Sequence, residues 1–142
     1  MSRIVEEMVV TPDVVDPARL RSAIRRVREF GVVLPTFSEL AKPPSHNLDR
    51  IDPDEPRSEN LWRVNWYNGP DRRKRVDVPG HIVLPEALTG VKAPIVVLLG
   101  CRFPMIGAHK VLPAYAGLAQ RLATGRFDPA EHKAIWPSTG NY

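Results

Sequence analysis

The strongest constraint on the fold is a short apolar run, APIVVLLG, at residues 93–100. The run is too short for a core helix and contains no charged residue, which is typical of a strand buried on both faces. Helical and extended patterns follow it in a β-α-β order, and ligands of such sheets bind at the carboxyl ends of the strands. We therefore expect an α/β fold with a partial, open, mostly parallel sheet and flanking helices.

Two segments carry helix signals. Residues 17–30 follow Asp16, a good N-cap residue, and begin with Pro17, which favours the first helical position. The second helix follows the sequence GAHK. Its apolar side chains recur at helical spacing, and Gly125 closes it; they are Val111, Tyr115, Leu118 and Leu122.

The other segments are expected to be irregular or extended. Residues 41–60 are rich in proline and acidic residues and predict a long surface loop. Alternating apolar and polar residues predict a strand at 61–68, and short strands are expected at HIVLP (81–85) and HKAIWPS (132–138). We expect an N-terminal extension at 1–83 and a ligand-binding region at 84–142.

Composition indicates the cellular compartment and excludes some classes of partner. The single cysteine, Cys101, cannot form an internal disulfide, and Glu6 and Glu7 interrupt the apolar stretch that a signal peptide needs. No apolar run approaches the roughly 20 residues that span a bilayer. We expect a cytoplasmic protein with no membrane partner. The four histidines lack paired ligand spacing, so no metal site is expected.

Basic residues concentrate at 19–29 and 71–75, and the formal net charge is +4. Either cluster could contact nucleic acid. The ordinary explanations are a solvated helix face and a charged loop tip, because neither cluster has interleaved aromatic residues or zinc-ligand spacing. We therefore expect no nucleic-acid partner, and a basic nucleic-acid-binding domain is the last of the alternatives.

The sequence GAHK places Lys110 at the start of the second helix. Unpaired backbone N–H groups make that position electropositive, so the lysine loses its proton more easily there, and a neutral amine condenses with aldehydes. The ordinary alternative is a surface lysine. The turn at Ser138, Thr139, Gly140 and Asn141 offers hydroxyls, an amide and backbone N–H groups that suit a carboxylate, although such turns are also common connectors.

These two motifs, separated by one helix and one strand, resemble the N-terminal half of pyridoxal-phosphate enzymes of the tryptophan synthase β-subunit and cysteine synthase type. The resemblance covers about residues 84–142 and makes this region the start of a pyridoxal-phosphate-binding domain. It implies that Lys110 forms the Schiff base with pyridoxal 5'-phosphate and that His109 lies by the cofactor phosphate. It further implies that Asn141 contacts the cofactor ring oxygen, while Ser138, Thr139 and Gly140 receive the substrate carboxylate.

The implied activity is a lyase or synthase reaction on an amino acid, by β-elimination or β-replacement. The family's glycine-rich phosphate loop lies downstream of the asparagine turn and is not found in these 142 residues. We therefore expect the chain alone to be incomplete and inactive, and to associate as a homo-oligomer or with a complementing chain. A non-catalytic interaction module that retains half of the fold is the main alternative.

Overall fold

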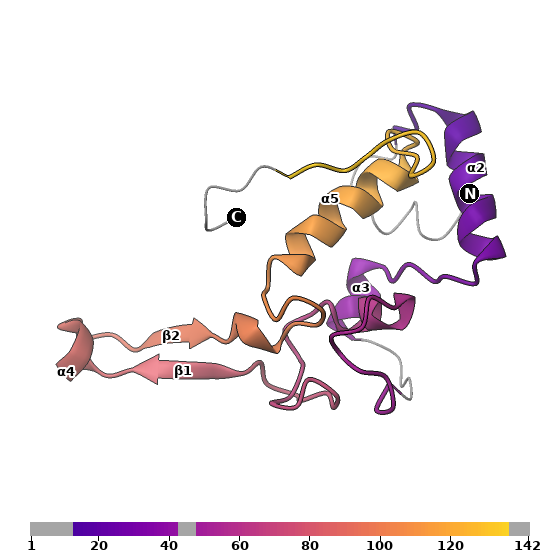
Figure 1. The fold of residues 1–142 in the computed structure, drawn as a ribbon. Coiled ribbons are helices and arrows are strands. Elements are labelled where there is room, and N and C mark those ends of the chain that lie inside the picture. The colour runs from indigo at the N-terminus through magenta and orange to yellow at the C-terminus, as the bar shows by residue number, and fades with distance from the viewer. Residues whose placement is uncertain (1–12, 43–47, 137–142) are drawn as a thin grey trace. The chain divides into compact units, whose positions relative to one another are not determined.

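The computed structural model describes residues 13–42 and 48–136. The chain divides into two compact units, one formed by Met1–Pro44 with Leu112–Tyr142 and the other by Ser45–Val111. The first unit contains α2, α3 and nearly all of α5, and the second contains two short 3-10 helices, a hairpin and α4 (Figure 1). The predicted division of the chain at residue 84 stays a prediction.

Helix α2 spans Pro17–Glu29 and confirms the predicted helix at 17–30. The side chain of Asp16 accepts hydrogen bonds from the backbone N–H groups of Ala18 and Arg19, at 3.0 and 2.9 Å. These bonds satisfy N–H groups that the first turn of a helix leaves unpaired. The sequence signal was reliable here because both capping residues act within a single turn.

Helices α3 (Phe37–Ala41) and α5 (Val111–Ala123) complete the first unit. α3 begins with a capping box, in which Thr36 and Glu39 bind each other's backbone N–H groups. The buried hydroxyl of Tyr115 on α5 donates to the carbonyl of Pro35 at 2.7 Å, and burial raises the pKa of this phenol. The buried apolar side chains of this unit come from all three helices: Ala23, Leu40, Tyr115, Ala119 and Ala123.

The strand predicted at 61–68 is wrong, because Ser58–Arg63 forms a 3-10 helix, η1, followed by turns. Asparagine side chains explain the difference. Asn68 donates to the carbonyls of Arg63 and Asn65, and Asn65 donates to the carbonyl of Trp62. These bonds satisfy backbone carbonyls that a strand would pair with a neighbouring strand. The loop predicted at 41–60 is irregular between residue 48 and the start of η1.

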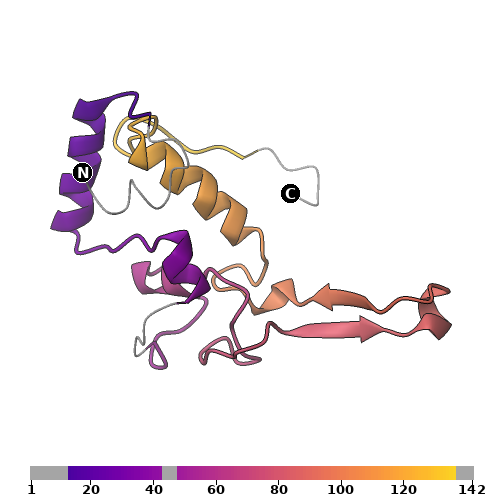
Figure 2. The same ribbon diagram turned by 180° about the vertical axis from the view of Figure 1, so that it is seen from behind.

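Two short strands, β1 (His81–Leu84) and β2 (Ile95–Leu98), pair antiparallel. The turn of helix α4 (Glu86–Thr89) and Gly90, whose φ is 68°, reverse the chain between them. The strands lie side by side in both views of the ribbon (Figures 1 and 2). A third short helix, η2 (Gly100–Arg102), follows β2 directly.

The expected fold class, an open and mostly parallel α/β sheet, is wrong. Within the described residues the sheet has two strands, and they are antiparallel. The apolar run at 93–100 does form a strand, but Val96, Val97 and Leu98 are exposed rather than buried. The chain reverses at α4 and Gly90, so the run pairs with the preceding strand and not with a distant parallel one.

The strand predicted at 132–138 is also wrong over its described part. Residues 132–136 have no regular secondary structure, and all of them are exposed. An isolated extended segment gains little without a neighbouring strand to accept its hydrogen bonds. Among the described helices, none is both long and apolar enough to cross a membrane.

Candidate functional site

The described part of the predicted site is the turn from Gly107 to Lys110. Lys110 is half-buried and lies one residue before α5, as the sequence predicts. The chain approaches it through two left-handed residues, Met105 with φ of 65° and Gly107 with φ of 58°. The N–H of Met105 donates to the carbonyl of Pro53 at 2.7 Å, which holds the entry of the turn to another loop of the same unit.

The imidazole of His109 stacks on the indole of Trp66. The two ring centroids are 5.8 Å apart and the ring planes differ by 22°. Trp66 in turn meets Phe103 edge to face at 4.9 Å, and Phe103 is completely buried. Both distances fall in the range of favourable aromatic pairs. The residue before Lys110 is therefore connected to the core of its unit through one aromatic side chain.

Gly100, the first residue of η2, contacts His109. A Cβ atom placed on Gly100 would lie 2.8 Å from Nδ1 of His109 and 3.3 Å from its Cβ, which is closer than real Cβ atoms approach their neighbours. By contrast, a Cβ on Gly107 would meet only the carbonyl of Cys101, at 3.9 Å. The site therefore has one glycine that a side chain would crowd and one whose Cβ would meet only an ordinary contact.

The predicted site residues fall into two groups, those in the described turn and those outside the described residues. His109 and Lys110 are together, in a turn that packs against Gly100 at the start of η2. Ser138, Thr139, Gly140 and Asn141 lie outside the described residues. Trp66 and Gly100 were not predicted as part of the site, because nothing in their spacing from His109 connects them to it. Their neighbours in sequence point to a turn and to the end of a strand, and no more.

The side chains at this turn limit what it can bind. The Lys110 amine can attack an aldehyde, and His109 offers ring nitrogens that can hydrogen-bond an anion. Over residues 13–42 and 48–136, no group of three or more histidine, cysteine or acidic side chains could hold a metal ion.

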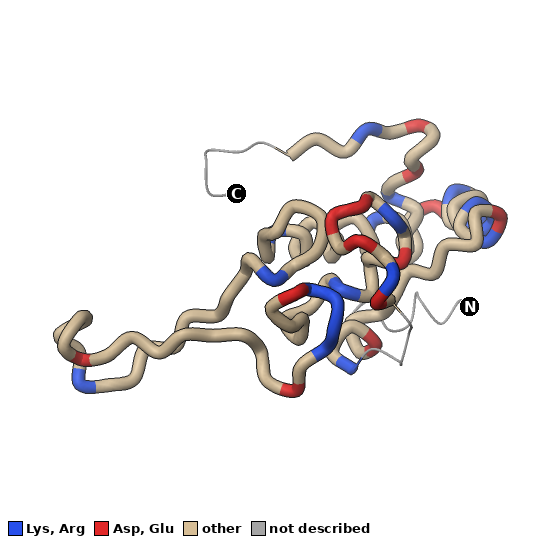
Figure 3. The backbone as a smooth tube through the Cα atoms, turned by 60° about the horizontal axis from the view of Figure 1, so that its bottom comes forward, with Lys and Arg blue, Asp and Glu red and all other residues tan. Residues whose placement is uncertain are grey.

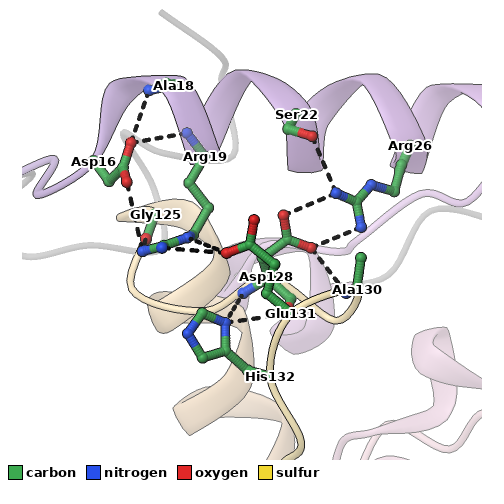
Figure 4. Close-up of polar contacts among 10 residues, drawn as sticks. All are labelled: Asp16, Ala18, Arg19, Ser22, Arg26, Gly125, Asp128, Ala130, Glu131 and His132. Atoms are coloured by element: carbon green, nitrogen blue, oxygen red, sulfur yellow. Dashed lines mark hydrogen bonds and ion pairs between the residues drawn. The ribbon is translucent and has the colours of Figure 1, made fainter.

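Two arginines of α2, Arg19 and Arg26, bind acidic side chains of the segment after α5 (Figure 4). Arg26 binds both carboxylate oxygens of Asp128, at 2.7 and 2.8 Å, and the Asp128 side chain is only 2% exposed. The N–H of Ala130 and the Arg26 guanidinium lower the pKa of Asp128. Arg19 binds Glu131 and the carbonyl of Gly125. These contacts fasten the segment after α5 to α2.

The second basic cluster, at 71–75, is also engaged within its own unit. Arg72 forms a two-pronged ion pair with Asp54, at 2.5 and 2.6 Å, and this pair lowers the pKa of the Asp54 carboxyl. Arg73 donates to the carbonyls of Asp49 and Ile51. Arg75 lies 5.0 Å from the ring centre of Tyr67. These arginines therefore hold loops together, and releasing them to bind phosphate would cost those bonds.

Comparison with known proteins gives no relative: no family model, no curated protein and no solved structure matches this chain.

Proposed function

We propose that this chain carries the lysine of a pyridoxal-phosphate-dependent lyase or synthase that acts on an amino acid by β-elimination or β-replacement. The observation that carries the proposal is the placement of Lys110. It is half-buried, it directly precedes the 13-residue helix α5, and its neighbour His109 packs against Gly100 at the start of η2. The proposal does not depend on a parallel sheet.

The cofactor suits the described residues chemically. Its aldehyde needs a primary amine, which Lys110 provides one residue before α5. Its flat ring must approach the backbone closely, and a Cβ on Gly107 would meet no atom closer than the carbonyl oxygen of Cys101, at 3.9 Å. Its phosphate needs hydrogen-bond donors, of which the imidazole of His109 can provide one. When bound, the cofactor provides a ring that accepts the negative charge left at Cα of the substrate.

The chain's own residues would divide the remaining work. The Lys110 amine would take the proton from Cα of the substrate as a general base. In the resemblance, Asn141 contacts the cofactor ring, while Ser138, Thr139 and Gly140 hold the substrate carboxylate. Fixing the carboxylate aligns the Cα–H bond with the ring, which is an effect of orientation rather than of reactivity.

The experiment is borohydride trapping with substoichiometric pyridoxal phosphate, followed by peptide mass mapping. We expect most of the label on the peptide that contains Lys110, and Lys110→Ala should remove it. Lys92→Ala is the matched control, because Lys92 is exposed at the tip of the hairpin and should not be preferred. Label spread evenly over Lys42, Lys74, Lys92, Lys110 and Lys133 would contradict the proposal.

One observation favours the alternative of an interaction module. The strands of the hairpin expose apolar side chains on both faces, including Ile82, Val83, Val96 and Val97. Exposed apolar surface of this kind is more common at binding sites than on isolated monomers. An even spread of the trapped label, combined with association through the hairpin, would favour this alternative over the enzyme.

A further inference from the structure

We infer that Trp66 and Gly100 are positioning residues for Lys110 and that they act through His109. The inference rests on the proposed function, because it concerns how the reactive amine is aimed. All four residues belong to the unit formed by Ser45–Val111, and each contact involved lies within that unit. We call Trp66 and Gly100 together the His109 clamp.

The first side of the clamp is held firmly. The indole of Trp66 rests on the completely buried ring of Phe103. The backbone on both sides of Trp66 is fixed by Asn65, whose side chain accepts from the N–H of Tyr67 at 2.8 Å and donates to the carbonyl of Trp62 at 2.9 Å. The indole therefore presents a fixed surface, and stacking on it limits the orientations that the His109 ring can adopt.

The second side of the clamp is the backbone at Gly100. This glycine does not have the positive φ of Gly90 or Gly107, so its conformation is open to other residues. What opposes a side chain is space, since a Cβ would lie 2.8 Å from Nδ1 of His109 and 3.3 Å from its Cβ. Rotation of the ring would relieve the contact with Nδ1 but not the tight contact with Cβ. A side chain at residue 100 would therefore turn the His109 ring and press on the Cβ of His109.

Displacing His109 displaces Lys110, because the two Cα atoms are held about 3.8 Å apart by the peptide bond. Reactions that depend on attack geometry are sensitive to such movements, and a misplacement of about 1 Å can cost about 100-fold in rate. The His109 clamp therefore bears on the reactivity of Lys110 through the position of its backbone. It also explains why an exposed histidine carries two close contacts.

The first test compares trapping of pyridoxal phosphate by the whole chain and its variants. We expect Gly100→Ala and Trp66→Leu to lower the ratio of label on Lys110 to label on Lys92 by about 10-fold or more. Gly117→Ala is the matched control, because a Cβ on Gly117 meets open space, and it should leave the ratio unchanged. Trp66→Phe keeps an aromatic surface and should retain most of the labelling.

A double-mutant cycle separates positioning from damage to the fold. In a His109→Ala background the imidazole is gone, so adding Gly100→Ala should change the labelling ratio much less than it does in the wild type. An equal loss in both backgrounds would overturn the inference. So would normal labelling of Lys110 in both Gly100→Ala and Trp66→Leu, although the proposed function would then stand.

The second test does not depend on the cofactor. The ring protons of His109 should show a ring-current shift in the NMR spectrum, which Trp66→Leu removes and Gly117→Ala preserves. If this shift is present and wild-type Lys110 is not preferentially labelled, the contact exists but both the proposed function and the positioning role are overturned. If wild-type Lys110 is labelled and the shift is absent, the inference fails alone.

Discussion

Asp128 shows how one buried carboxylate can hold two segments together. It lies after α5, yet its bonds reach Arg26 in the last turn of α2 as well as the N–H of Ala130. Charge-assisted pairs with two parallel bonds are stronger than single neutral hydrogen bonds. Removing either partner would leave the other without its main contact, so we expect the pair to fail as a unit.

We predict that Asp128 makes the free energy of unfolding decrease at acid pH. Its folded pKa lies below the ordinary value, so its contribution is fully present above the unfolded pKa of about 3.9. The contribution is lost as the pH falls through the lower folded value. Urea unfolding at pH 7, 5 and 3 should show a smaller loss between pH 5 and pH 3 for Asp128→Asn than for the wild type.

Arg26→Gln is the control for this prediction. It removes the guanidinium and keeps the carboxylate, so it should weaken the acid dependence without abolishing it, because the bond from Ala130 remains. An identical acid profile for the wild type and Asp128→Asn would show that other carboxylates account for the acid sensitivity.

At the scale of elements, two glycines of α5 differ in whether alanine can replace them. The glycine inside the helix can be replaced, and the glycine that follows its end cannot. Gly117 lies inside the helix with open space around its Cβ position, whereas Gly125 has φ of 75° and a Cβ there would lie 2.3 Å from the carbonyl oxygen of Asp16. At residue 117, glycine has only one disadvantage relative to alanine, its lower helix propensity. The second needs glycine both for its conformation and for the close approach of another backbone.

We predict opposite effects for the same substitution at these two positions. Gly117→Ala should raise the free energy of unfolding by about 0.5–1 kcal/mol, the usual difference between alanine and glycine inside a helix. Gly125→Ala should lower it by more than about 1 kcal/mol, since the left-handed conformation and the overlap with backbone both oppose a side chain. Thermal and urea unfolding of the two variants measure both values, and effects of the same sign would contradict this account of α5.

Some elements could be predicted from the sequence and others could not. The difference is whether the interaction that forms the element joins residues close together or far apart in the sequence. α2 and α5 were predicted well, since Asp16, Pro17 and Gly125 act within a turn of the helix they limit. The runs at 81–85 and 95–98 were recognised as extended, but their partner and direction depended on how α4 and Gly90 reverse the chain. The strand expected at 61–68 failed because asparagine side chains satisfy the backbone there.

The same argument applies to the site. The position of Lys110 next to a helix could be predicted from GAHK and the pattern that follows it. The contacts of His109 with Trp66 and Gly100 could not, because they join segments that are distant in sequence and have no shared spacing. The turn at 138–141 lies outside the described residues, so its predicted role stays a prediction.

At the scale of the whole molecule, the hairpin carries the largest group of exposed apolar side chains among the described residues. Both strands appear without charged residues in Figure 3, and within the hairpin the charges lie around its tip. Long or uncharged strand edges favour pairing with another chain, and a two-stranded hairpin is only marginally stable by itself. The hairpin is therefore the place where the chain should associate with itself.

We predict concentration-dependent association that weakens when the hairpin is made more polar. Val96→Thr combined with Val97→Thr changes one residue on each face while keeping the β-branched shape, and it should increase the fraction of monomer. The matched control is Val15→Thr combined with Val33→Thr, at two valines of similar exposure outside the hairpin, 59% and 57%. Sedimentation velocity at several concentrations measures the difference.

Salt distinguishes this association from binding to nucleic acid. Apolar association should persist or strengthen as salt is raised, whereas contacts with phosphate weaken steeply. A wild-type chain that remains monomeric at every concentration would contradict the role given to the hairpin. Association that disappears with salt and is unaffected by the Val96 and Val97 substitutions would point to the basic clusters instead.

The apolar character of both faces of the hairpin also affects its register. In most two-stranded ribbons, a slip of one residue would carry polar side chains into the core and is therefore costly. Here the slip would exchange Ile82 with Val83 and Val96 with Val97, so the two alignments expose nearly the same surface. The ends must therefore fix the alignment: the N–H of Leu99 donates to the carbonyl of Gly80 at 2.8 Å, and the left-handed Gly90 fixes the reversal. Lengthening the connection between the strands would free them to slide.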